Sequence, residues 1–209
     1  MIWLARWSKS RATCLFAYLF LTGFGDAFAV TLYAINGGNA HLIAFSSDTP
    51  STLSTDVALS GVTGYTLKAV SVRPSTGELY GFAIPQLFGA ARLVKIDVTT
   101  GGATTVGDGP TVSDSASTQY GMAFDPVTDQ IRIVSGSSNF RINPGTGTLI
   151  ADDGALAYAA SDPRTGQPVL TGKLAYTNAF SGPVTEATAY VVETGSSGFG
   201  AIDVVATLG

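Results

Sequence analysis

The stretch that decides the fold is Val72–Tyr80 (VRPSTGELY), in which a short polar turn separates two apolar runs. Phe124–Arg132 (FDPVTDQIR) and Ser161–Val169 (SDPRTGQPV) repeat the same order of residue types. Proline fixes φ early in a turn, and glycine or aspartate tolerates the left-handed conformation that lets the chain double back. Each of the three stretches is therefore predicted to form a strand, a turn and a second strand.

A second kind of hairpin is interleaved with the first. Lys95–Thr104 (KIDVTTGGAT) and Arg141–Leu149 (RINPGTGTL) carry it. Both kinds recur with a period of about 50 residues, and two hairpins per period make a four-stranded unit, the signature of a propeller blade. The predicted fold class is all-β, a β-propeller-like array of four-stranded repeats, with Gly77 and Gly101 at turn positions where φ is positive.

The repeats divide one all-β domain, residues 30–209, into four units at about 30–59, 67–109, 120–153 and 174–209. The first unit lacks an opening strand, and the fourth keeps the strand pattern but has lost much of its turn chemistry. Two alternatives stay open: a strand from the far terminus closes the ring, or the domain is incomplete at its C-terminal end and belongs to a larger ring.

The N-terminus carries the features of a secretory signal peptide. A basic segment, Arg6–Arg11, precedes the apolar run Cys14–Phe24, and Ala27–Ala29 supplies the small-x-small pattern before a cleavage site. The alternative is a transmembrane anchor, but the run is shorter than the about 20 residues that a spanning helix needs. We expect residues 1–29 to be removed and the mature chain, without a membrane span, to be secreted, periplasmic or at the cell surface.

Charge and cysteine content exclude two classes of chemistry. The chain has 11 Lys and Arg against 15 Asp and Glu, a formal net charge of −4. Nucleic acid is excluded as a partner because phosphate binding requires a basic face. The single cysteine, Cys14, lies in the predicted leader, so the mature chain has neither a disulfide nor a reactive thiolate.

Six motifs follow one another along the chain: Leu32–Ile35, Arg73–Tyr80, Phe124–Val134, Arg141–Pro144, Asp153–Tyr158 and Ala175–Asn178. Taken in this order they resemble a bacterial exported family, domain of unknown function 4394 (DUF4394). The resemblance covers about Thr31 to Asn178, and past Asn178 the chain departs from the pattern. It implies a propeller-like β fold in exported, often surface-associated bacterial proteins, and it supplies no catalytic residues.

Few residues suit catalysis or metal binding. His41 is the only histidine, which excludes a multi-histidine metal site, and its surroundings indicate a surface residue at the start of a strand. No catalytic residue and no cofactor is predicted. The weak metal candidates are Asp152 and Asp153 beside Gly154, because adjacent carboxylates can bind calcium through oxygen. Most other aspartates begin turns, where the side chain caps its own backbone.

Three arginines, Arg73, Arg132 and Arg141, lie beside apolar strand residues and are predicted to be structural. A buried guanidinium requires a carboxylate, and Asp125 and Asp129 are the nearest in sequence to Arg132. We expect these groups to pair between neighbouring units. The alternative is a site for an anionic ligand at the mouth of a central channel.

Two classes of function stay open. The first is an exported, non-catalytic binding or interaction module that presents Asn, Ser, Thr and Tyr to a glycan or protein partner. The second is a propeller-type hydrolase or lactonase with an oxygen-ligated metal in the central channel. Three or more Asp, Glu or Asn side chains converging from different repeats would favour the enzyme. With one His and three Glu in the chain, the sequence favours the binding module.

Overall fold

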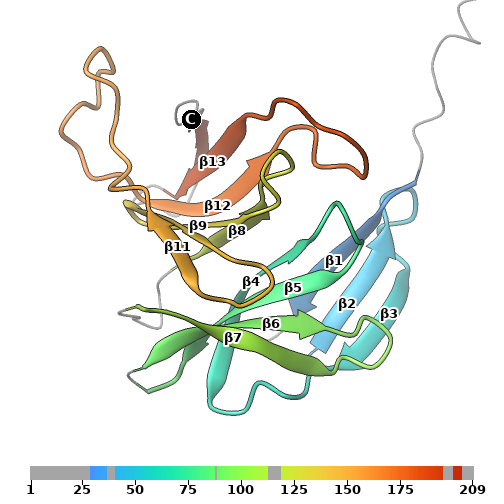
Figure 1. Ribbon diagram of the computed structural model, residues 1–209. Helices are drawn as coiled ribbons and strands as arrows, with labels where there is room; N and C mark the ends of the chain where they lie inside the picture. The colour runs from blue at the N-terminus through green and yellow to red at the C-terminus, as the bar shows by residue number, and fades with distance from the viewer. Residues whose placement is uncertain (1–28, 37–40, 88, 113–118, 195–199, 204–209) are drawn as a thin grey trace, which may run out of the picture.

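The computed structural model describes residues 29–36, 41–87, 89–112, 119–194 and 200–203, shown in colour in Figure 1. The predicted signal peptide lies outside these ranges apart from Ala29. Within them every regular element is a β-strand, which confirms the all-β class. Those ranges contain no helix with the length and apolar character needed to cross a membrane.

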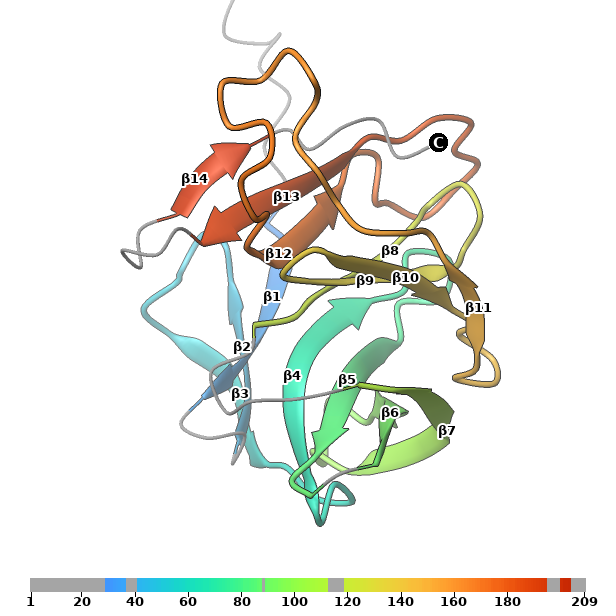
Figure 2. The same cartoon turned by 90° about the vertical axis from the view of Figure 1, so that its left-hand side faces the viewer.

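Four antiparallel sheets follow one another along the chain (Figures 1 and 2). Sheet 1 comprises β1 (Thr31–Asn36), β2 (His41–Ser46) and β3 (Leu53–Ala58). Sheet 2 comprises β4 (Tyr65–Val72), β5 (Leu79–Pro85), β6 (Ala90–Ile96) and β7 (Ala103–Thr111). Sheet 3 comprises β8 (Gly121–Phe124), β9 (Ile131–Ser135), β10 (Ser138–Ile142) and β11 (Leu149–Asp152). Sheet 4 comprises β12 (Thr171–Tyr176), β13 (Ala189–Thr194) and β14 (Gly200–Asp203). Within each sheet, strands that are consecutive in the chain pair with each other. No strand pairing joins sheet 4 to sheet 1 within the described residues.

Four hairpin turns in sheets 2 and 3 share one backbone geometry. They begin at Arg73, Asp97, Asp125 and Asn143, and the N–H of the residue four positions later donates to the carbonyl of the first at 2.8 Å in each. That later residue has positive φ: 73° at Gly77, Gly101 and Gly147, and 57° at Asp129. The turn reverses the chain because its last residue is left-handed, the conformation that glycine adopts without steric cost.

The third stretch with this pattern, Ser161–Val169, does not form the predicted strands. It lies in the irregular connection between β11 and β12. Its turn does form, since Thr165 N–H donates to Asp162 O at 3.0 Å and Gly166 has a φ of 83°. The flanking strands are absent because the turn is followed by Pro168, which has no N–H to donate to a neighbouring strand.

Buried apolar side chains join each sheet to the next. The largest cluster lies between sheets 2 and 3, where the ring centroids of Phe82 and Tyr120 are 5.6 Å apart and those of Tyr80 and Phe124 are 5.3 Å apart. Smaller clusters join sheets 1 and 2, around Leu42 among others, and sheets 3 and 4. A sheet that is apolar on both faces needs a neighbour on each side, so the stacked order follows from the repeat.

The first strands of sheets 2, 3 and 4 lie next to one another, with β8 in contact with both β4 and β12. At Gly121 the backbones of β8 and β12 approach so closely that a Cβ would lie 2.8 Å from Leu174 N. Sheets 1 and 2 are joined by a bridge between Ser60 and Gly102. Sheets 2, 3 and 4 therefore diverge from a common line formed by their first strands, as the two views in Figures 1 and 2 show.

Gly101→Ala is expected to destabilise the protein more than Gly77→Ala. Both glycines have a φ of 73°, which costs an L-residue about 1 kcal/mol. A Cβ at Gly77 meets no atom within 4 Å, whereas one at Gly101 would lie 2.3 Å from Ala58 O. That overlap should add about 1–3 kcal/mol to the loss. Urea unfolding measures the difference, and equal losses would show that sheet 1 does not approach this turn.

Candidate functional site

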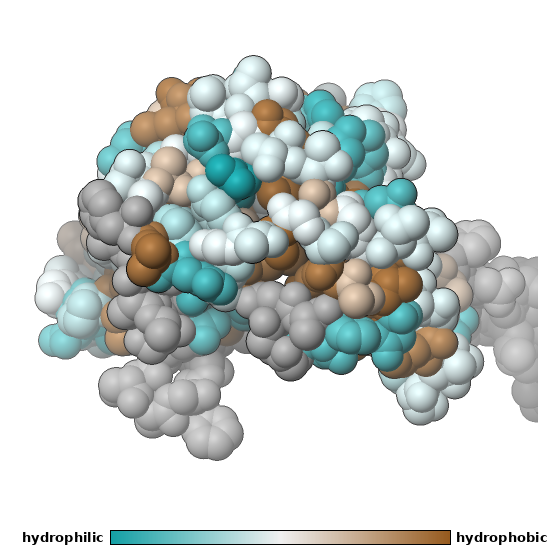
Figure 3. Space-filling view, turned by 90° about the horizontal axis from the view of Figure 1, so that it is seen from below, coloured by the Kyte–Doolittle hydropathy of each residue, from teal (hydrophilic) through white to brown (hydrophobic). Residues whose placement is uncertain are grey.

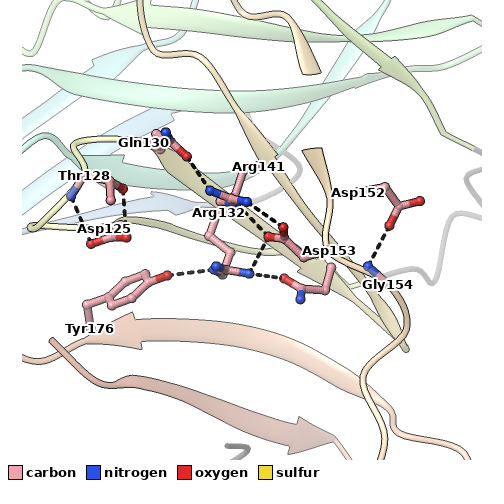
Figure 4. A network of polar contacts seen from close by, with 10 residues as sticks. Asp125, Thr128, Gln130, Arg132, Arg141, Asp152, Asp153, Gly154 and Tyr176 are labelled. Atoms are coloured by element: carbon pink, nitrogen blue, oxygen red, sulfur yellow. Dashed lines mark hydrogen bonds and ion pairs between the residues drawn. The ribbon is translucent and has the colours of Figure 1, made fainter. Parts of the chain in front are cut away.

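Arg132 on β9 is the centre of a polar network between sheets 3 and 4 (Figure 4). The residue is only 4% exposed. Its Nη1 donates to Asn139 Oδ1 at 2.7 Å and to Asp153 Oδ2 at 2.8 Å, and its Nε donates to Tyr176 Oη at 2.7 Å. The guanidinium is thus bound by a carboxylate, an amide and a phenol, as a buried cation requires.

Asp153 is shared by two arginines. Arg141 donates from Nε and Nη2 to its two carboxylate oxygens, each at 2.7 Å, and from Nη1 to Gln130 Oε1 at 2.9 Å. The hydrogen bond from Arg141, followed by the charge of Arg132, lowers the pKa of Asp153 below its ordinary value. The same pairing raises the pKa of Arg141. The carboxylate of Asp153 and the guanidinium of Arg141 therefore favour each other's charged form.

Tyr176 on β12 connects this network to sheet 4. Burial raises the pKa of its phenol, and the hydrogen bond from Arg132 only partly opposes that effect. The sequence did not single out Tyr176 or Asn139 as partners of Arg132. Tyr176 lies 44 positions from Arg132 in the chain, so no local pattern marks the contact.

The carboxylates expected beside Arg132 lie elsewhere, so that part of the prediction is wrong. Asp125 caps its own turn, accepting from Val127 N–H at 2.8 Å and Thr128 Oγ1 at 2.8 Å. Asp129 is at the far end of that turn and faces sheet 2. Both residues belong to the turn before β9. Arg132 instead lies opposite Arg141 on β10, and its carboxylate partner Asp153 follows β11, the strand beyond β10.

Asp129 pairs with Arg73 and so links the turn of sheet 3 to the turn of sheet 2. Arg73 Nε donates to both carboxylate oxygens at 3.0 Å, its Nη2 donates to Oδ2, and Ser75 Oγ donates to Oδ1 at 3.1 Å. The hydrogen bond from Arg73 lowers the pKa of Asp129. Arg73 takes the turn position that Asp97 and Asp125 occupy elsewhere, and its side chain reaches the neighbouring sheet instead of its own backbone.

The two weak metal candidates do not form a calcium site. Both oxygens of Asp153 are bound by guanidinium groups, and Asp152 Oδ1 accepts from Gly154 N–H at 3.0 Å. Figure 4 shows Asp152 set apart from the arginine pair. The part of the chain that the structure describes contains no group of three or more His, Cys, Asp or Glu side chains able to hold a metal ion. Two cations beside Asp153 would repel a third.

Beside this network lies a pocket of about 550 Å³, which we call the serine pocket. It lies between the end of β7 and the outer half of sheet 3, and hydroxyl-bearing, small and apolar residues line it. Among the described lining residues, Asp152 is the one ionisable carboxylate. The lining residues are Pro110, Thr111, Val112, Tyr120, Ser135, Gly136, Ser137, Ser138, Phe140, Leu149, Asp152, Gly154 and Ala155.

The arginine network fixes one wall of the serine pocket. Asp153 N–H donates to Asn139 O at 3.0 Å, and Leu156 N–H donates to Ser137 O at 2.7 Å. These bonds tie the segment after β11 to the β9–β10 hairpin. Since the carboxylate of Asp153 is held on the other side by Arg132 and Arg141, its neighbour Asp152 is positioned on the pocket wall.

A second pocket, the central pocket, lies where the first strands meet and has a volume of about 340 Å³. It is lined by Ile35, Leu67–Val70, Tyr120–Met122, Lys173 and Leu174. None of these residues is Asp, Glu or Asn. The convergence of oxygen ligands that would favour a metal-dependent hydrolase is thus missing from the described lining.

The remaining titratable candidates lie outside both pockets. His41 at the start of β2 pairs with Asp56, its Nδ1 at 2.6 Å from Oδ1, and both side chains are largely exposed. Glu78 accepts from Lys95 Nζ at 2.7 Å across sheet 2. Neither arrangement supplies a nucleophile with an activating base.

The surface around these elements is mixed in character. Figure 3 views the molecule from below and shows hydrophobic residues gathered around a hollow near the middle of that face, with hydrophilic residues about its rim. Such a surface suits recognition by shape and hydrogen bonding more than by charge.

The fold and the site define a class: an all-β repeat protein with antiparallel sheets stacked in chain order and a ligand-sized pocket between two of them. The chain belongs to the family described as Domain of unknown function (DUF4394), whose model matches residues 41–198. No curated protein and no solved structure shows a significant match to the chain.

Proposed function

We propose that the chain is an exported, non-catalytic binding module with a propeller-like fold, and that the serine pocket receives a glycan. The observation that carries the proposal is the composition of this pocket. Its volume of about 550 Å³ suits a small saccharide, since ligand sites commonly enclose about 300–1,000 Å³. Serine and threonine hydroxyls and one carboxylate surround an apolar floor, a combination that matches a neutral ligand rich in hydroxyl groups.

The floor and the rim of the pocket have different roles in this proposal. Tyr120 and Phe140 are 3% and 8% exposed, so they supply an apolar base and not a stacking platform. Ser137, Ser138 and Asp152 are exposed at the rim and available to a ligand's hydroxyls. The carboxylate of Asp152 accepts hydrogen bonds from sugar hydroxyls more strongly than a neutral oxygen would.

The hydrolase or lactonase alternative is less well supported. It requires carboxylates or amides to converge at the centre, and the described lining of the central pocket offers lysine and apolar residues. At the serine pocket, Asp153 is paired with arginine, and Asp152 is the one carboxylate among the described lining residues. A hydrolytic mechanism with two carboxylates has no second partner there.

Export follows from the leader and from the composition of the chain. Arg6–Arg11, the apolar run Cys14–Phe24 and Ala27–Ala29 have the order of a signal peptide. Mass spectrometry of the protein recovered from outside the cytoplasm should give a chain that begins at Val30. Recovery of an intact residue 1–29 segment would contradict export by cleavage.

The glycan proposal is tested by screening the purified mature protein on an array of neutral oligosaccharides and measuring the hits by calorimetry. Ser137→Trp should fill the serine pocket and abolish binding, and Asp152→Ala should weaken it at least about tenfold, the effect of losing about 1.4 kcal/mol. Ser51→Trp, on the exposed β2–β3 turn, is the matched control and should bind normally. Binding unaffected by both pocket variants would assign the ligand to another surface.

A further inference from the structure

Within the described residues, sheet 1 has no strand equivalent to the one that begins sheets 2, 3 and 4. The strand orders are β1-β2-β3 in sheet 1 and β4-β5-β6-β7 in sheet 2. In sequence, Leu32–Ile35 (LYAI) matches Leu79–Phe82 (LYGF) on β5, the second strand of sheet 2. β1 is therefore a second strand by its sequence, and the position equivalent to β4 holds no strand within the described residues.

The backbone of β1 has hydrogen-bonding groups directed at this empty position. Ser47 N–H donates to Val30 O at 2.9 Å, so Val30 and Ser47 form a hydrogen-bonded pair. Hydrogen-bonded pairs alternate along an antiparallel ladder. Leu32 and Ala34 therefore bond to β2, and Tyr33 and Ile35 direct their N–H and C=O groups to the other edge.

The same alternation holds in the complete sheets, where a first strand uses the equivalent groups. Arg73 N–H donates to Glu78 O at 2.9 Å, which makes Ser71 and Tyr80 a hydrogen-bonded pair between β4 and β5. By the same reasoning, Asp125 N–H to Gln130 O makes a pair of Ala123 and Arg132. Tyr33 takes the place of Tyr80 and Arg132, but among the described strands of sheet 1 it has no such partner.

The first strands of the other sheets share a side-chain pattern at this position. The residue opposite the equivalent of Tyr33 is always small, and the residues on either side of it are apolar. The triplets are Val70-Ser71-Val72 on β4, Met122-Ala123-Phe124 on β8 and Leu174-Ala175-Tyr176 on β12. This apolar-small-apolar triplet is thus what the second strand of a repeat accepts.

A hollow lies beside β1. Ile35 lines the central pocket of about 340 Å³ together with residues of β4, β8 and β12. An uncovered edge is a template for pairing with another chain, and added strands are a common mode of peptide recognition.

We infer that the free edge of β1 is a strand-accepting site for a partner polypeptide. The occupant is an extended segment with an apolar-small-apolar triplet, bonded antiparallel to Tyr33 and Ile35, with its small residue opposite Tyr33. This site is separate from the serine pocket and does not depend on the glycan proposal. It makes the protein a receptor for a donated strand.

The probe is a fluorescently labelled peptide with the sequence of residues 171–178, TGKLAYTN, which contains the triplet of β12. The control peptide, TGKALYTN, has the same composition but exchanges the Leu and the Ala, so its small residue can lie opposite Tyr33 only if the register slips by one residue and every side chain turns to the other face. Anisotropy titration of the mature chain should give saturable binding of the first peptide at least about tenfold tighter than of the control.

Two variants at one position separate the backbone contact from the side chain. Tyr33→Pro removes the N–H at the free edge, and edge positions tolerate proline, so the fold should persist and peptide binding should fall at least about tenfold. Tyr33→Ala keeps the N–H and should retain more of the affinity. Hydrogen exchange on the unmutated protein gives a second readout, because the peptide should slow exchange at Tyr33 and Ile35 and leave Leu32 and Ala34 unchanged.

Several results would overturn the inference. Equal affinity for the two peptides, or no saturable binding, would show that the edge does not select the triplet. Slow exchange at Tyr33 and Ile35 in the peptide-free monomer would show that the chain covers this edge itself. A dimer in gel filtration that Tyr33→Pro dissociates would assign the edge to a second copy.

Discussion

Replacing Arg132 with alanine is expected to lower the free energy of unfolding by about 3–5 kcal/mol. The residue is 4% exposed and bonds to Asn139, Asp153 and Tyr176. Its removal leaves an amide and a phenol without a donor between sheets 3 and 4, and Asp153 with half of its compensating charge. Chemical unfolding followed by circular dichroism measures the loss.

Lys95→Ala is the matched control for Arg132→Ala. Lys95 also pairs with a carboxylate, Glu78, but both side chains are well exposed, and solvent screens such pairs. Its loss should be much smaller. If Arg132→Ala and Lys95→Ala behave alike, the guanidinium of Arg132 is solvated and the sheet-joining role of the network is wrong. A Tyr176→Phe variant should lose less than Arg132→Ala, because it removes one hydrogen bond and no charge.

Local turn chemistry explains why much of the fold could be predicted from sequence. The bonds that define the turns at Arg73 and Asp97 span four residues, and the residues that make them, a turn-starting Asp or Arg and a left-handed Gly, stand together in the chain. A repeat of such turns separated by alternating apolar residues leaves little choice except antiparallel sheets. The strands of sheets 2 and 3 can therefore be predicted from the sequence one hairpin at a time.

The partners of Arg73 and Arg132 could not be predicted from the sequence in this way. Arg73 meets Asp129 across 56 positions, and Arg132 meets Tyr176 across 44. Asp125 and Asp129 are the carboxylates nearest to Arg132 in sequence, but its partner is Asp153, so nearness in the chain does not identify the pair. In a stack of sheets, the side chains on one face of a strand point toward the neighbouring sheet. The partner of a charged residue is therefore determined by which sheet lies beside it and not by its own hairpin.

Position along the stack also decides where the turn signal fails. Ser161–Val169 has the residues of a hairpin turn and makes the turn, but no strand flanks it. The residue types of the turn do not by themselves make the flanking strands, because Pro168 has no N–H for a strand ladder, and sheet 4 begins only after this segment, at β12. The serine pocket was likewise hidden in the sequence, because its walls come from two sheets and meet only when these stack.

Phe82→Ala is expected to destabilise the protein by about 3–5 kcal/mol, the usual cost of removing a large aromatic side chain from a core. Phe82 on β5 is 0% exposed, and its ring lies 5.6 Å from that of Tyr120 and 6.2 Å from that of Phe140. Phe140 lies on β10 of sheet 3, and Tyr120 lies directly before β8, the first strand of that sheet. The lost contacts are therefore between sheets, and the ladder of sheet 2 is untouched.

The effect of Phe82→Ala should consequently extend beyond the sheet that carries it. If the core between sheets 2 and 3 is one cooperative unit, hydrogen exchange in the variant should rise on β8 and β9 as much as on β5 and β6. Phe45→Ala, at a half-buried position at the outer end of β2, is the control and should cost less, with faster exchange confined to sheet 1. Faster exchange on sheet 2 alone after Phe82→Ala would mean that each repeat is stable by itself. That outcome would contradict the stacked order, because a sheet with apolar residues on both faces is unstable when one of those faces is exposed to water.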